Sequence, residues 1–86
     1  MMGTMDLQLI LGEFSAVDAL ELVAQMIHIK IKFHEERVGQ DSSEEDIKYR
    51  ESKIKQLQKQ LCQLRTAVGP EMDRLKLDAT IRITAP

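Results

Sequence analysis

Two long segments without helix breakers constrain this chain more than any other feature. Residues 13–38 and 40–68 contain neither glycine nor proline, and Gly12, Gly39 and Gly69 mark their ends. Such segments favour two helices with glycines as boundaries. Because only a short link separates them, we expect the two helices to be antiparallel neighbours.

The first segment predicts a helix over residues 16–38. Ser15, followed three residues later by Asp18, is typical of a helix start, and Gly39 suits a left-handed C-cap. Residues 27–33 also alternate apolar and polar side chains, as a half-buried strand does. We favour helix there, because no turn residue flanks the alternation and three-four spacing passes through it.

The second segment predicts a helix over residues 43–68, starting either at Ser42 with Glu45 or at Ser43 with Asp46. Its apolar residues recur at the three-four spacing of a narrow coiled-coil seam. They are Ile47, Ile54, Leu57, Leu61, Leu64 and Val68, and Arg50 fills the seam position between Ile47 and Ile54. The matching seam of the first helix consists of Val17, Leu20, Ala24, Ile27, Ile31, His34 and Val38.

Alternating apolar residues predict strands at both ends of the chain, over residues 5–11 and 75–84. In the first strand, Leu7, Leu9 and Leu11 would share one face. The sequence leaves open whether the two strands pair within one chain or between chains. We therefore predict a single α+β domain over residues 1–86, mainly α, in which terminal strands flank a coiled-coil-like hairpin of long helices.

The first helix carries a second apolar stripe on the side away from the seam. Its members are spaced four, three and four residues apart: Leu22, Met26, Ile29 and Phe33. A helix that is apolar on two sides must be covered twice, and a short ribbon cannot cover a stripe of this length. We therefore predict a homo-oligomer, most simply a two-fold dimer forming a four-helix bundle, with these residues at the interface. The alternative is that residues 70–86 of the same chain cover the stripe.

Two polar residues, His34 and Arg50, occupy seam positions near the same turn of the hairpin. They predict a polar layer that fixes the register of the helices. The alternative is a metal or acid–base site that combines His34 with Glu35, Glu36 or Glu51. No second histidine lies one turn away, however, because His28 is six residues from His34 and off its face. No phosphate-binding loop or nucleophile–base motif is present either. We therefore expect no catalytic, metal-binding or cofactor-binding residues, and no enzymatic activity.

The basic residues of the second helix form the main alternative binding surface. Lys48, Lys53, Lys55, Lys59 and Arg65 could bind an anion or nucleic acid, or could be an ordinary solvated face. The net charge is −2, from 12 Lys and Arg against 14 Asp and Glu. This balance, and the lack of aromatic residues among the cations, argue against a nucleic-acid partner.

The remaining features concern the cellular setting. Cys62 is the single cysteine, so it cannot form an intrachain disulfide and fits a reducing compartment. The N-terminus lacks the pattern of a signal peptide, and no apolar stretch is long enough to span a membrane. We expect a cytoplasmic, homo-oligomeric module for protein–protein interaction, scaffolding or regulation, with an unidentified protein partner and no membrane contact. The alternative function is anion or nucleic-acid binding through the second helix.

Overall fold

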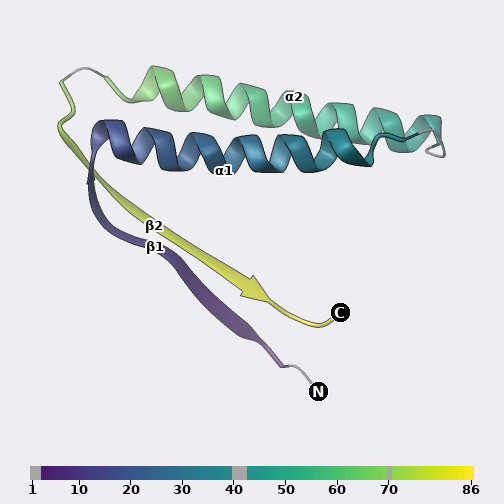
Figure 1. Cartoon of the computed structure of the whole chain (residues 1–86), viewed down its shortest axis with the longest axis horizontal. Helices are drawn as coiled ribbons and strands as arrows, with labels where there is room; N and C mark the ends of the chain where they lie inside the picture. The colour runs from purple at the N-terminus through teal and green to yellow at the C-terminus, as the bar shows by residue number, and fades with distance from the viewer. Residues whose placement is uncertain (1–2, 40–42, 70) are drawn as a thin grey trace.

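The computed structural model describes residues 3–39, 43–69 and 71–86. In chain order its elements are β1 (Met5–Ser15), α1 (Ala16–Arg37), α2 (Glu44–Ala67) and β2 (Arg74–Ile83). The two helices form a hairpin, and the two strands form an antiparallel ribbon that leaves the base of the hairpin (Figure 1). The predicted mixture of helices and strands is confirmed, residues 27–33 are helical, and the strands pair within one chain.

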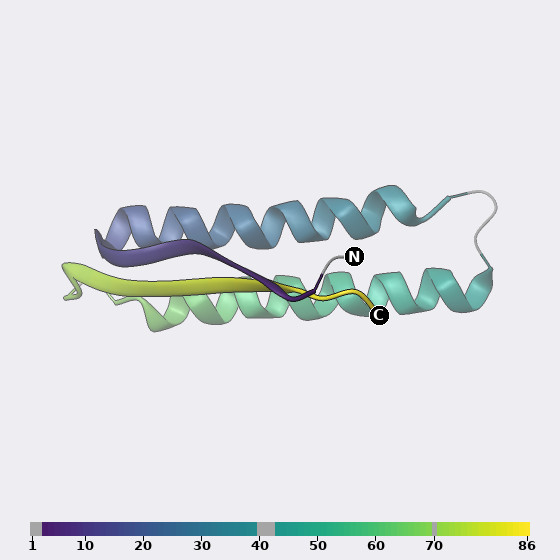
Figure 2. The ribbon, with the colours of Figure 1, turned by 90° about the horizontal axis from the view of Figure 1, so that it is seen from below.

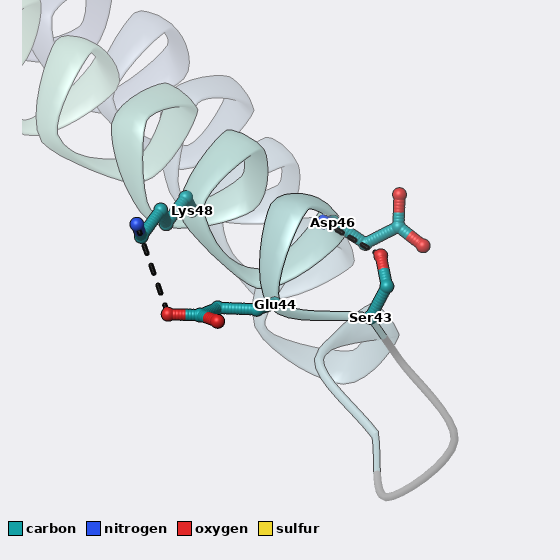
Figure 3. Close-up of polar contacts among 4 residues, drawn as sticks. All are labelled: Ser43, Glu44, Asp46 and Lys48. Carbon is teal, nitrogen blue, oxygen red and sulfur yellow. Dashed lines mark hydrogen bonds and ion pairs between the residues drawn. The ribbon is translucent and has the colours of Figure 1, made fainter.

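Both helices begin at a serine cap. The Ser15 hydroxyl accepts a hydrogen bond of 3.1 Å from the Asp18 amide, and the Ser43 hydroxyl accepts one of the same length from the Asp46 amide (Figure 3). Ser43 is therefore the cap of α2, and the alternative Ser42 lies outside the described residues.

Figure 3 also shows an ion pair at the start of α2, in which Lys48 Nζ lies 3.8 Å from Glu44 Oε1. Both side chains are highly exposed, so the pair adds at most about 0.5 kcal/mol to helix stability. The serine caps, at about 1 kcal/mol each, matter more for where the helices start.

Each helix ends at a C-cap residue with an extended backbone. Val38 has φ −81° and ψ 94°, and Val68 has φ −84° and ψ 95°. The Val68 amide still donates to the Leu64 carbonyl at 3.1 Å, which closes the last turn of α2. Gly39 does not have a positive φ, so the predicted left-handed cap is wrong.

The seam between α1 and α2 forms the core of the hairpin. Ala24 and His34 of α1 are buried in it, as are Leu57 and Leu61 of α2. Val17 was predicted to continue this seam but is 75% exposed. The prediction is wrong at this end because α2 stops at Ala67, so no further turn of α2 covers the first turn of α1.

A β-bulge at Leu9 changes which residues of β1 share a face. The register runs from Gln8 opposite Thr80 directly to Ile10 opposite Ala79, which leaves Leu9 without a partner. An extra residue reverses the alternation beyond it. Leu7 and Leu11 therefore lie on opposite faces, and the prediction that Leu7, Leu9 and Leu11 share one face is wrong.

The bulge gives the ribbon one uncharged face, which we call the inner row. Cross-strand partners share a face of a sheet, so the register places Met5, Leu7, Ile10, Gly12, Phe14, Leu75, Leu77, Ala79, Ile81 and Ile83 in this row. Charged pairs lie on the other face: Arg82 Nε lies 3.1 Å from Asp6 Oδ1, and Arg74 Nε lies 3.9 Å from Glu13 Oε2.

The chain is extended for its size. Its radius of gyration is 16.2 Å, whereas a compact domain of this length has one of about 12 Å. The reason is visible in Figures 1 and 2: the ribbon runs along the same direction as the hairpin but diverges from it, so that hairpin and ribbon form the two arms of a wedge. One backbone hydrogen bond, from the Ala16 amide to the Asp73 carbonyl at 2.8 Å, ties the arms together at the base.

Candidate interaction surface

The narrow end of the wedge contains a pocket of about 360 Å³ between the ribbon and α1. Its apolar walls are Phe14 of the inner row and Leu22 of α1. Its polar lining comes from α1 alone: Asp18, Glu21 and Gln25. This pocket therefore combines apolar walls with two carboxylates.

The predicted interface residues of α1 run outward from this pocket. Leu22 lines it, and Met26, Ile29 and Phe33 continue along the same helix face at spacings of four, three and four. All four side chains are exposed, from 37% for Leu22 to 68% for Ile29. Residues 71–86 leave the stripe open to this extent, because the ribbon diverges from α1 (Figure 1).

The opposite wall of the wedge is the inner row of the ribbon. Away from the base its side chains are also exposed: Leu7 by 42%, Ile81 by 44% and Met5 by 49%. Reasoning from the sequence missed this surface in β1, because the bulge that aligns Ile10 and Phe14 with Leu7 has no mark in the apolar pattern. Knowledge of the pairing with β2 would have revealed it.

The outer end of the stripe carries positive charge. The Arg37 guanidinium carbon lies 4.6 Å from the centre of the Phe33 ring, and that of Arg50 lies 5.7 Å from it. Both distances are within the range of cation–π contacts. The stripe therefore has carboxylates at its base and guanidinium groups at its outer end.

The structure brings the two residues of the predicted polar layer into contact. Arg50 Nη1 lies 2.9 Å from His34 Nδ1. An arginine can only donate, so Nδ1 accepts and the proton of the neutral ring is on Nε2. Burial is the main cause that lowers the pKa of His34, and the positive charges of Arg50, Lys30 and Lys53 lower it further.

The structure does not gather the five predicted anion-binding residues on one surface. Lys48, Lys55 and Lys59 follow one another at spacings of seven and four along one exposed face. Lys53 lies on another side of α2, where its Nζ is 5.5 Å from the centre of the Tyr49 ring and near His34. Arg65 is exposed near the end of the helix. Anion binding by this set stays a prediction.

Other kinds of site find little support in the part of the chain that the structure describes. No group of three or more His, Cys, Asp or Glu side chains in residues 3–39, 43–69 and 71–86 could hold a metal ion. Neither α1 nor α2 is long and apolar enough to cross a membrane, over the residues described. Cys62 is an exposed free thiol.

Comparison with known proteins assigns the chain to no family. No family model matches the chain, and no curated protein or solved structure is significantly similar to it. The functional proposals below therefore rest on the geometry of the wedge.

Proposed function

We propose that this protein is a non-catalytic, homo-oligomeric interaction module, and that a dimer is its basic unit. A second copy covers the apolar stripe of α1, so that the two hairpins form a four-helix bundle. The observation that carries the proposal is the exposure of two uncharged rows, the stripe and the inner row, on facing walls of one wedge.

The size of the exposed surface supports a dimer. The accessible surface of the chain is 7091 Å², whereas a folded monomer of 9.8 kDa exposes about 5,200 Å². If each copy buried the difference of about 1,900 Å², the total of about 3,800 Å² would lie within the range of obligate dimers. Uncharged rows also suit a two-fold contact, because the same surface meets itself there.

Sedimentation velocity of the wild type and of Ile29→Asp tests the proposal. We expect a wild-type dimer at micromolar concentration. A carboxylate at position 29 would be buried without a partner, so we expect the dissociation constant to rise at least about 100-fold. His28→Asp is the matched control, since His28 is exposed, adjacent and off the stripe. A wild type that sediments as a folded monomer of 9.8 kDa overturns the proposal.

The proposal includes a further, unidentified protein partner in a reducing, cytoplasmic setting. Within the described residues β1 and β2 pair only with each other, so each keeps an open edge that could take up an extended peptide. The free thiol of Cys62 supports a reducing compartment. Affinity capture from the native cell, with Ile29→Asp as the comparison, tests whether partner binding needs the dimer. Capture of no protein by the dimeric wild type contradicts this part of the proposal.

A further inference from the structure

We infer that the pocket at the narrow end of the wedge is the receptor for Phe33 and Arg37 of a second copy, with the two α1 helices packed antiparallel. This inference rests on the proposed dimer and specifies its contacts. It follows from the spacing of the stripe, from the charges at its two ends and from the lining of the pocket.

The spacing of the stripe reads the same in both directions. Leu22, Met26, Ile29 and Phe33 are separated by four, three and four residues, so an antiparallel copy aligns with it in register. Leu22 then lies opposite Phe33 of the other copy, and Met26 lies opposite its Ile29. A two-fold axis between these pairs repeats each contact, as a self-complementary interface requires.

The same register places opposite charges together. Asp18 lies four residues before Leu22, and Arg37 lies four residues after Phe33. In the antiparallel dimer Asp18 of each copy therefore lies opposite Arg37 of the other. Residues 1–26 contain four acidic residues but no Lys or Arg, whereas residues 27–40 have three Lys and Arg against Glu35 and Glu36, a net charge of +1. The two halves of α1 therefore attract when they meet head to tail.

The lining of the pocket matches the side chains that this register places beside it. Phe33 of the second copy would enter between Phe14 and Leu22, which form the apolar walls. The guanidinium of Arg37, which lies over the Phe33 ring, would arrive beside Asp18 and Glu21 on the polar lining. The aromatic ring of Phe33 thus contacts the apolar walls, and its stacked guanidinium lies beside the carboxylates.

A charge-swap experiment tests the inference in the full chain. Asp18→Arg and Arg37→Glu each place like charges opposite one another twice per dimer, and we expect each to raise the dissociation constant about tenfold at low salt. The double variant Asp18→Arg/Arg37→Glu restores opposite charges, so its dissociation constant should return to within about threefold of the wild type. Sedimentation velocity measures the constants, and circular dichroism verifies folding.

The controls separate this inference from the proposed function. Within one chain, residues 18 and 37 are about 28 Å apart along α1, so only contact between copies can produce the rescue. Asp18→Arg/Lys32→Glu carries the same net charge as the double variant but alters Lys32, which is off the stripe, and should not restore the dimer. A dimeric wild type without rescue by Arg37→Glu overturns the inference and leaves the proposed dimer in place. A monomeric wild type overturns both.

Discussion

Truncation of Leu57 measures how much the hairpin depends on its seam. Leu57 is 7% exposed, so Leu57→Ala removes three buried carbons, worth about 0.8 kcal/mol each on transfer. The cavity adds to this loss, and core Leu→Ala changes cost about 2–5 kcal/mol. The seam is one row of side chains with solvent on both sides, which lets the helices relax, so we expect about 2.5–3.5 kcal/mol.

Such a loss is large for this chain, whose free energy of unfolding should be about 4–13 kcal/mol. We expect the melting temperature to fall by about 10–28 °C. The assay is thermal unfolding followed by circular dichroism at 222 nm, at one protein concentration, because dimerisation would make the melting temperature depend on concentration. Gln58→Ala is the matched control, since Gln58 is adjacent and exposed. Equal, small shifts for both variants would refute the view that the seam holds the hairpin together.

Three further changes test the local chemistry of the fold. The pKa of His34 is lowered in the folded state, so the unfolded chain takes up a proton more readily than the folded one. The free energy of unfolding, measured by urea titration, should therefore fall as the pH drops from 7.5 through about 6.5. The variant His34→Gln should remove this dependence on pH. Gly12 has φ +148°, and a Cβ there would meet only Phe14 Cε2, at 4.0 Å. Gly12→Ala should therefore lower the free energy of unfolding by about 1–3 kcal/mol through backbone strain alone. Gly3→Ala is the control and should leave the free energy of unfolding almost unchanged. Ser43→Ala should cost about 1 kcal/mol and shorten α2, as amide exchange at its first turn would report; unchanged exchange there would contradict the cap.

The helices could be predicted from the sequence because their limits are set locally. Ser15 caps α1 as its spacing to Asp18 indicates, and the predicted range 16–38 differs from the observed one only at Val38, the C-cap. The same spacing narrowed the start of the second helix to two neighbouring residues, because Ser42 with Glu45 and Ser43 with Asp46 both have it. No distant contact is needed for these assignments.

The end of the first strand could not be predicted in the same way, because a glycine such as Gly12 can either end a strand or lie within it. A glycine commonly ends a strand, so the prediction stopped at residue 11, yet β1 continues to Ser15. The positive φ of Gly12 is accommodated inside the strand, close to the bulge at Leu9. Whether a glycine interrupts or continues a strand depends on the partner strand, which the local sequence does not contain.

The polar residues of the candidate site were predictable in kind but not in arrangement. The seam spacing placed His34 and Arg50 in one layer, and the structure adds the hydrogen bond between them. The pocket involving Phe14 and Leu22 could not be foreseen, since it needs the ribbon to return beside α1. Sites between elements depend on tertiary geometry, whereas sites on one helix face depend only on periodicity.

The distribution of charge on the ribbon indicates which of its faces would be buried in the proposed assembly. Asp6, Glu13, Arg74 and Arg82 all lie on the face opposite the inner row, where they pair across the strands. A ribbon exposed to water on both faces has no reason to confine its charges to one of them. The bulge at Leu9 maintains this separation along the full length of β1, because without it the charged and apolar residues would exchange faces midway. The inner row therefore has the composition of a buried surface, and in the proposed dimer the second copy would bury it.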